Sequence, residues 1–346
     1  PRRQCGHARS LKRQGRADPV RFALPVLLLI LAAIATLAAG VRAVSVPEIW
    51  HALVAFDPMN PLHIVIHDIR LPRLIAGLAA GASLGMAGSI MQSLTRNPLA
   101  DPGLMGVNAG AAFTIVLGAF LFGRADGGFI AALSFPGAAL ASLAVFAIGG
   151  GLRGEAGPVR LTLAGIALNA LLMSLVSAIV LTRTEALEVF RFWAAGSLAQ
   201  ANVRPLLEMS AIAALGAGCA LLLAPRLEAL ALGTGLAKGL GTKPGRIQLG
   251  ALAVLTMLTG AAVSIAGPIA FLGLMVPPLA RRISGHNLRL ELLVSALFGA
   301  TILLLADTAG RLLVAPAEIR VGIMTALIGA PVFIWIARRL RPGALT

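Results

Sequence analysis

Long apolar runs alternate with short polar stretches along almost the whole chain. An α-helix needs about 20 apolar residues to cross the ~30 Å hydrocarbon core of a bilayer, and most of the runs have about this length. The pattern predicts an all-α polytopic membrane protein with about ten transmembrane helices, of which the eighth is short and broken by prolines. The predicted spans are 22–40, 72–94, 103–122, 129–150, 160–182, 203–224, 247–265, 270–283, 292–310 and 322–338.

The composition supports this interpretation. Of the 346 residues, 58% are hydrophobic and 12% are charged, and the mean hydropathy is +0.89, whereas a soluble domain has roughly 25% charged residues. The formal net charge of +15 would suggest a nucleic-acid partner in a soluble protein, but here the basic residues lie mainly in short loops at the ends of the apolar runs. Because this bias is typical of membrane topology, we expect no nucleic-acid partner and place both termini in the cytoplasm.

The runs divide the chain into a basic cytoplasmic tail at 1–21, a single transmembrane domain at 22–338 and a cytoplasmic tail at 339–346. The first apolar run follows a basic stretch, as in a signal peptide, but it is longer than a signal core and more spans follow it. We therefore expect it to be retained as a helix. The longest polar connectors, each too short for a soluble domain, are 41–71, 183–202 and 225–246.

The segment 226–246 is rich in glycine and lysine and invites comparison with a phosphate-binding loop. Such a loop ends in Gly-Lys-Ser/Thr, whereas here Lys238 precedes Gly239 and Lys243 precedes Pro244. We expect no nucleotide site and interpret the segment as a cytoplasmic helix pair that docks a partner. The chain is then not an enzyme and holds no cofactor, and any ATPase is a separate subunit.

Glycines recur at helical spacing along the second span, at Gly77, Gly81, Gly85 and Gly88. A helix face lined by such small residues lets another backbone approach closely, which predicts a packing face inside the bundle. Near the eighth span, proline interrupts the apolar sequence at Gly267-Pro268 and at Pro277-Pro278. Since proline removes a helix donor, these positions form either a hinge or pathway wall, or a structural kink.

Four arginines lie at the outer ends of predicted spans, against the topological bias. Their position suggests an acidic protein partner on the outer face, although single arginines near a span end also bind lipid headgroups. We expect Arg70, Arg73, Arg311 and Arg320 to form this docking surface.

Asp307 and Arg311 are spaced i, i+4, which allows either a functional ionisable site within a span or an ordinary ion pair. His63 and His67 have the same spacing and are either metal or haem ligands or structural residues. A histidine pair without a third ligand is a weak metal signal. Cys5 and Cys219 have no metal-like spacing, so we expect no metal site.

Between about Arg70 and Arg339 the chain resembles the permease subunits of ABC importers for ferric siderophores, haem and cobalamin. The resemblance depends on a series of motifs that occur in the family's order and spacing. They are Arg70-Leu-Pro-Arg73, Arg96-Asn-Pro-Leu-Ala-Asp-Pro-Gly103 with Gly106, Leu230-Ala-Leu-Gly233 with Ala237 and Leu240-Gly241, Gly267-Pro268, Phe271, Gly273-Leu274, Pro277, Arg281, Ala306-Asp307 with Arg311, Val321-Gly322 and Leu327-Ile-Gly-Ala-Pro331.

The resemblance implies a type II ABC importer permease fold in the bacterial inner membrane. It implies a second permease subunit, expected to be a copy of this chain, which encloses a central pathway with the first. Two ATPase subunits, which bind ATP and Mg, lie below this pair, and a periplasmic binding protein lies above it. Glutamates of that binding protein would meet Arg70, Arg73 and Arg311.

The resemblance also assigns the gate and the coupling surface. A cytoplasmic gate is formed by Asn97 and Leu99 together with Pro158 and Val159, although the polar residue types often found at the second part of this gate are absent here. The chain further departs from the family at Pro278, where histidine is common, and at Arg320, where proline is common. ATPase coupling is assigned to Leu227, Leu230, Gly233, Ala237, Leu240 and Gly241.

Two other classes are disfavoured by the residues within the spans. A secondary transporter needs ionisable groups at mid-membrane, and only Asp307 comes close, near a span end. An intramembrane enzyme needs a cluster of acid, base or metal groups, which the sequence lacks. The expected function is alternating-access import of an iron chelate, haem or a ferric siderophore, with cobalamin as the alternative cargo.

Overall fold

The computed structural model describes residues 19–40, 43–123, 126–151, 157–199, 203–231, 233–239, 241–285 and 287–339, and every regular element in these ranges is helical. Most of the tail at 1–21 and of the tail at 339–346 lies outside the described residues. In chain order the elements are α2 (Pro19–Ala38), α3 (Val46–Val54), α4 (Pro61–Ile64), the π-helix η1 (Val65–Arg70), α5 (Leu71–Thr95), the 3₁₀-helix η2 (Pro102–Met105), α6 (Val107–Phe122), α7 (Gly127–Ile148), α8 (Pro158–Val180), α9 (Thr184–Ala194), α10 (Val203–Ala231), α11 (Thr234–Gly239), α12 (Pro244–Ala266), α13 (Leu272–Ser284), α14 (Leu288–Leu313) and α15 (Val321–Arg339).

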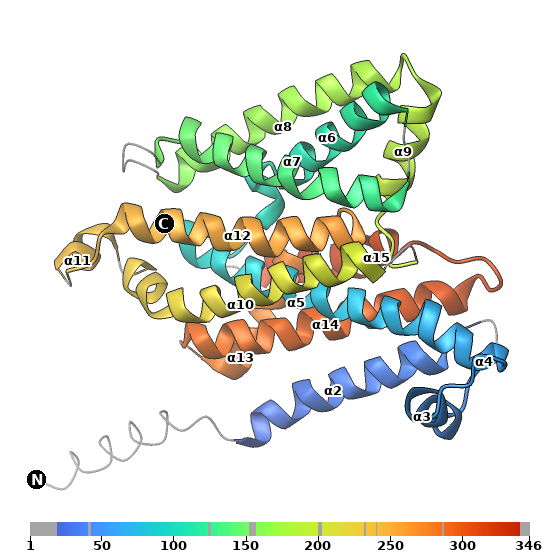
Figure 1. Cartoon of the computed structure of the whole chain (residues 1–346). Coiled ribbons are helices and arrows are strands. Elements are labelled where there is room, and N and C mark those ends of the chain that lie inside the picture. The colour runs from blue at the N-terminus through green and yellow to red at the C-terminus, as the bar shows by residue number, and fades with distance from the viewer. Residues whose placement is uncertain are drawn as a thin grey trace, which may run out of the picture.

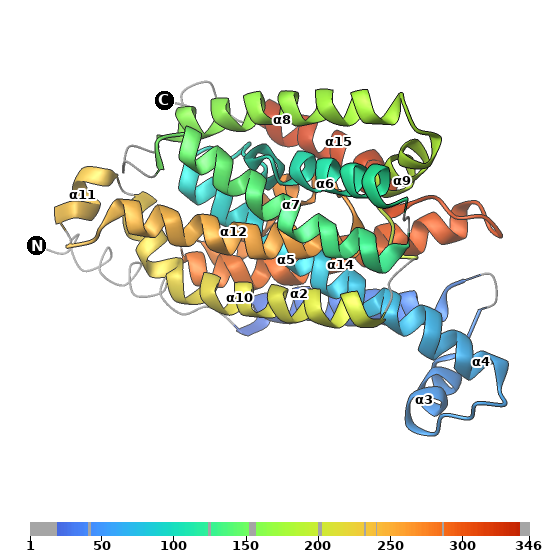
Figure 2. The same cartoon turned by 45° about the horizontal axis from the view of Figure 1, so that its top comes forward.

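Helix α5 lies at the centre of the bundle and packs against α10, α12, α13 and α14. Helices α6, α7 and α8 form a second layer, which contacts the first through α7 and α12 (Figures 1 and 2). Helix α2 packs on α14 from the opposite side. We call the end of the bundle that carries α3, α4 and α9 the α9 end, and the opposite end the α11 end (Figure 1). The most apolar window of the segment Pro61–Thr95 is 78% buried, so this helix is shielded mainly by protein.

Each of the ten predicted spans contains one α-helix, and the span 103–122 also contains most of η2, which confirms the all-α membrane fold. By length and composition, five helical segments among the described residues can cross a membrane, and four apolar helices are shorter. Helix α13 has 13 residues and contains Pro277 and Pro278, in agreement with the short eighth span.

Two predicted polar connectors contain helices instead. The connector 41–71 holds α3, which begins with a capping box in which Glu48 bonds back to Ser45, and η1, which continues directly into α5. The connector 183–202 holds α9. These helices are short and contain polar residues, so the sequence pattern does not distinguish them from connectors.

The prediction of a separate helix pair at 226–246 is wrong. Helix α10 continues to Ala231, α11 is a short helix, and α12 begins at Pro244. The first six residues of the segment belong to α10, in which Leu227 and Leu230 are buried in the core.

The four glycines of α5 lie where other chain segments approach most closely. A Cβ atom at Gly81 would lie 2.6 Å from the Cα atom of Ala300, and one at Gly85 would overlap the carbonyl oxygen of Ser295. The approach is mutual, because a Cβ atom at Gly299 would overlap the backbone of Gly81. Below this contact the hydroxyl groups of Ser89 and Ser295 are hydrogen-bonded at 2.8 Å. The backbones of α5 and α14 therefore touch.

Replacing Gly85 by alanine should lower the midpoint of thermal unfolding in detergent. The new methyl group would meet backbone atoms, which cannot move away as a flexible side chain can, and overpacking of this kind costs about 1–3 kcal/mol. Gly218→Ala on α10 is the matched control, since its Cβ would meet nothing within 4 Å. Equal midpoints for the two variants would contradict the close α5–α14 contact.

Candidate functional site

A cluster of charged side chains joins α5 and α14 near the α9 end. The guanidinium group of Arg73 binds Asp307 with both Nε and Nη2, at 2.8 Å for Nε–Oδ2 and 2.8 Å for Nη2–Oδ1. Its Nη1 atom binds Glu318 at 2.9 Å. Asp307 also forms an ion pair with Arg311 at 3.3 Å, although the geometry there is not that of a hydrogen bond. One buried carboxylate thus holds two arginines.

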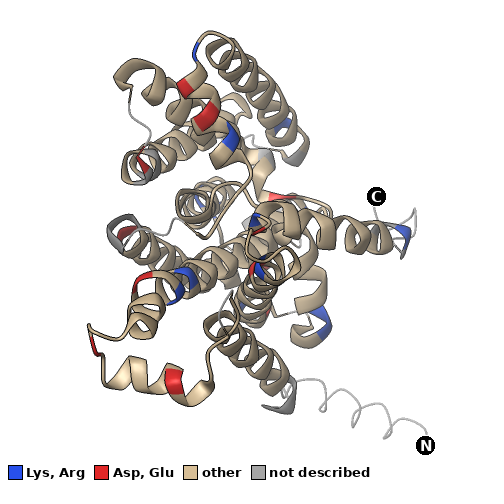
Figure 3. Cartoon of the chain, turned by 90° about the vertical axis from the view of Figure 1, so that its right-hand side faces the viewer, with Lys and Arg blue, Asp and Glu red and all other residues tan. Residues whose placement is uncertain are grey.

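The same arginines hold the end of α2. Arg311 donates hydrogen bonds to the carbonyl oxygen atoms of Ala39 at 2.7 Å and Thr36 at 3.2 Å. Arg70 donates to the carbonyl oxygen atoms of Leu37 and Ala38. Carbonyl groups in the last turn of a helix have no partner within it, and positive charge is favourable there. Figure 3 looks onto this end and shows basic and acidic positions close together on the ribbon.

All four arginines predicted to dock a partner make contacts within the chain, and three of them are buried. Arg70 and Arg73 are each 6% exposed and Arg311 is 9% exposed. Arg320, which is partly exposed, donates to the carbonyl oxygen of Phe192 and lies 4.7 Å from the centre of its ring. Glu318, the only acidic residue of the sequence after Asp307, is not predicted from the sequence to belong to this cluster. The docking role of the arginines stays a prediction.

The histidine pair has structural contacts. The Nδ1 atom of the buried His63 accepts a hydrogen bond from the backbone of Asp57 at 2.9 Å. His67 Nε2 lies 3.0 Å from the carbonyl oxygen of Ala52 on α3, so it donates there. Among the described residues no group of three potential metal ligands comes together. These contacts favour the structural interpretation, in which His67 holds η1 against α3 and His63 holds the loop that follows α3.

The predicted coupling residues divide into buried and exposed positions. Leu227, Leu230 and Ala237 are at most 4% exposed and pack into the core. Gly233 and Gly241 have positive φ angles of 123° and 74°, which glycine adopts at little cost. Leu240 lies outside the described residues. A partner at the α11 end would therefore touch the neighbouring exposed residues, among them Leu236, which is 64% exposed.

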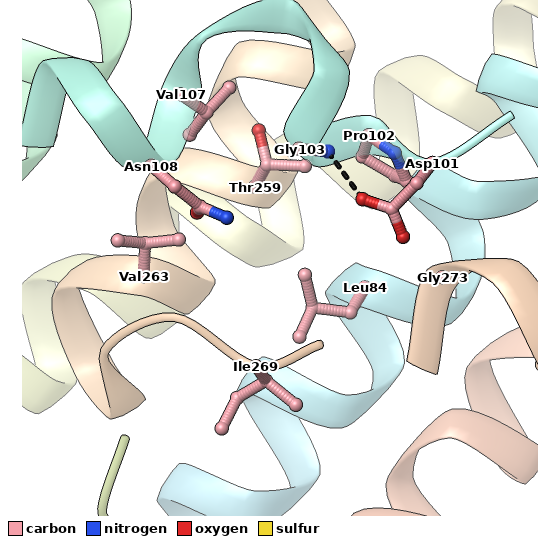
Figure 4. A pocket seen from close by; sticks show the side chains of 10 residues that line it. All are labelled: Leu84, Asp101, Pro102, Gly103, Val107, Asn108, Thr259, Val263, Ile269 and Gly273. Atoms are coloured by element: carbon pink, nitrogen blue, oxygen red, sulfur yellow. Dashed lines mark hydrogen bonds between the residues drawn. The ribbon is translucent and has the colours of Figure 1, made fainter. Parts of the chain in front are cut away.

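The first predicted gate segment forms a tight turn after α5. The side chain of Asn97 accepts a hydrogen bond from the backbone of Leu99 at 2.9 Å, and Asp101 accepts one from Gly103 at 2.7 Å (Figure 4). Such side-chain bonds replace those that a regular helix would supply. We call residues Arg96 to Asp101 the gate turn. The second predicted segment begins α8, where Val159 is 71% exposed.

The gate turn leads inward to a cavity of about 540 Å³. Most of its lining is apolar and comes from the start of α13, from α15 and from the non-helical stretch Pro268–Phe271. Asp101 and Asn108 contribute its polar side chains. A smaller cavity of about 10 Å³, the size of one water molecule, adjoins them beside Leu84 and Thr259 (Figure 4).

The smaller cavity lies deep in the bundle, and the larger one extends from it to Ala194 and Ala195 at the end of α9. Leu84, which lines the smaller cavity, precedes the end of α5 by 11 residues, which corresponds to about 16 Å along the helix. Non-helical backbone at membrane depth occurs only where protein buries it or where it lines a cavity. The break at Gly267-Pro268 therefore fits the predicted pathway wall. Neither Asp101 nor Asn108 is predicted from the sequence to line a cavity.

Comparisons with known proteins agree with this geometry. Residues 27–339 match the family model described as the FecCD transport family. The chain is 45% identical over 318 residues to the ferric enterobactin transport system permease protein FepD of Escherichia coli, covering 92% of this chain and 95% of that protein. It is 38% identical over 339 residues to the hemin transport system permease protein HmuU of Yersinia pestis, covering 94% and 98%.

The fold is also shared with a solved structure. A metal-chelate type ABC transporter in an inward-facing conformation superposes with a TM-score of 0.80 at 31% sequence identity, covering 93% of this chain and 99% of that one. Both findings confirm the resemblance that the motifs indicated. The chain belongs to the FecCD transport family and is a membrane permease component of an ABC importer.

Proposed function

We propose that this permease imports a ferric siderophore. The observation that carries the proposal is the 45% identity to the ferric enterobactin permease over 95% of its length, compared with 38% to the hemin permease. The cavity of about 540 Å³ has a volume in the range of small-molecule sites. Its mainly apolar wall binds a passing chelate weakly, so that the cargo is not trapped. Cobalamin is the alternative cargo.

The permease works in a larger assembly. It pairs with a second copy of itself to enclose the pathway, and two separate ATPase subunits bind ATP and Mg at the α11 end. A periplasmic binding protein delivers the chelate to the α9 end. The chain lies in the bacterial inner membrane with both termini in the cytoplasm, which agrees with the excess of basic residues in the loops assigned to that side.

Transport follows alternating access. Closure of the ATPases pushes on α11 and the end of α10, tilts the helices and changes which side of the gate is open. The gate consists of the gate turn and the start of α8. The chain holds no nucleotide-binding motif of its own, so the ATPase subunits supply the driving force.

Uptake into proteoliposomes should identify the cargo. Vesicles containing this chain and its ATPase, with the binding protein outside, are given ferric enterobactin, a ferric hydroxamate, ferric citrate, hemin or cobalamin. We expect accumulation of a ferric siderophore that requires ATP inside the vesicles and the binding protein outside. Preferential uptake of hemin or cobalamin would contradict the proposed cargo, and uptake driven by an ion gradient without ATP would contradict the proposed mechanism.

Glu318→Gln should strengthen docking of the binding protein. The side chain of Glu318 is 39% exposed and shares Arg73 with the buried Asp307. Loss of its charge leaves the Nη1 atom of Arg73 available to the glutamates of the binding protein. Because an exposed ion pair is worth about 0–1 kcal/mol, the gain in affinity should be at most about fivefold.

Arg320→Glu should instead slow association of the binding protein, since charges at an interface act mainly on the on-rate. Surface plasmon resonance at two salt concentrations measures both effects.

Asp307→Asn serves as the contrasting variant. Removing the carboxylate leaves Arg73 and Arg311 buried with too little negative charge, and breaking a buried pair costs about 3–5 kcal/mol. We expect a lower midpoint of thermal unfolding for Asp307→Asn and little change for Glu318→Gln. Weaker docking by Glu318→Gln would show that this carboxylate does not compete with the partner for Arg73.

A further inference from the structure

Arg96 occupies a backbone conformation that does not suit arginine. It ends α5 with φ = 53° and ψ = 30°, in the left-handed region. Helices that end in this conformation usually have glycine or asparagine at the position, because the Cβ atom of other residues is sterically unfavourable there. A residue held in an unfavourable conformation points to a function for its side chain.

The side chain of Arg96 binds the coupling segment. Its Nη2 atom donates a hydrogen bond of 2.7 Å to the carbonyl oxygen of Leu230, one residue before the end of α10. The same oxygen accepts the backbone N–H group of Gly233 at 3.1 Å, immediately before α11. A carbonyl group in the last turn of a helix is free to accept such bonds, and a positive charge is favourable at this end. One oxygen atom thus joins the end of α10, the start of α11 and Arg96.

The bond leads from the α11 end toward the cavity. The gate turn is internally braced by the side-chain bonds of Asn97 and Asp101, so a displacement of Arg96 is passed along it. Directly after the turn, Pro102 packs against Gly273 on α13, and Asp101 itself lines the cavity. Every step in this series is a direct contact between residues.

We propose that Arg96 is a positioning residue that couples the ATPase-facing segment to the cytoplasmic gate. Displacement of α11 and the end of α10 moves the carbonyl group of Leu230, the guanidinium group follows, and the gate turn moves with it. This inference rests on the proposed function, in which α11 receives the motion of the ATPase. It assigns to one side chain the mechanical link between the predicted coupling residues and the predicted gate.

A second arginine that binds α10, Arg289 of α14, provides a matched control. Arg289 Nε donates to the carbonyl oxygen of Leu221 on α10 at 3.2 Å. This bond also joins an arginine to α10, but it lies more than two helical turns from Leu230 and does not involve the gate turn. If Arg96 only stabilised α10, loss of either arginine would have a similar effect.

The test compares Arg96→Gly, Arg96→Lys and Arg289→Gln in proteoliposomes with the ATPase and the binding protein. Glycine suits the left-handed backbone, so Arg96→Gly removes the bond without straining the fold. The measured quantities are ferric enterobactin accumulated per ATP hydrolysed, the ATPase rate stimulated by the binding protein, and the amount of ATPase that co-purifies.

We expect Arg96→Gly to keep its ATPase and its stimulated hydrolysis while ligand transported per ATP falls about tenfold, within the usual range of coupling between sites. Arg96→Lys, which keeps the charge and one donor, should recover part of this ratio, and Arg289→Gln should match the wild type.

Two results would overturn the inference. One is an unchanged ratio of transport to hydrolysis in Arg96→Gly, and the other is loss of the ATPase from that variant alone, which would make Arg96 an assembly residue. Failure of the wild-type complex to take up any ferric siderophore with ATP would instead refute the proposed function, and the two failures are therefore distinguishable.

Discussion

The contact between the backbones of α5 and α14 organises the rest of this structure. Within a bilayer, lipid chains are as apolar as leucine, so helices associate through close packing and hydrogen bonds rather than through the hydrophobic effect. Gly81, Gly85 and Gly299 let the two helices touch, and the bond between Ser89 and Ser295 adds a polar contact within the buried seam. With α5 fixed against α14, the remaining helices arrange themselves around this pair.

Polar groups bind α14 to its neighbours at both ends. Near the α9 end Asp307 of α14 holds Arg73 of α5, and Arg311 reaches on to α2. At the α11 end Glu228 of α10 accepts the backbone N–H group of Leu288 at the start of α14, and Glu291 pairs with Arg281 of α13 at 3.1 Å. Because both proposed partners meet the permease at these fastened ends, the helix pair joins the docking surface to the coupling segment through the membrane.

Hydrophobic patterning predicts the helical class and the helix within each of the ten apolar runs, since a bilayer demands long apolar runs. It also placed the glycine face, because helical spacing depends only on sequence. The pattern gave no sign of α3 and α9, whose polar residues resemble a connector, or of the end of α10, whose burial depends on the other helices. Pairings such as Arg73 with Glu318, 245 residues apart, carry no sequence signal in a single chain. Asp101 was visible as part of a motif, but its place beside a cavity depends on how the gate turn folds inward.

The inward course of the gate turn also affects how the chain enters the bilayer. Helix α6 has only 16 residues, about 24 Å of helix, and is too short to cross ~30 Å of hydrocarbon alone. The chain between α5 and α6, which includes η2, must therefore lie below the membrane surface. Asn97 and Asp101 already satisfy backbone N–H groups within that stretch, which lowers the cost of burying it before the other helices arrive.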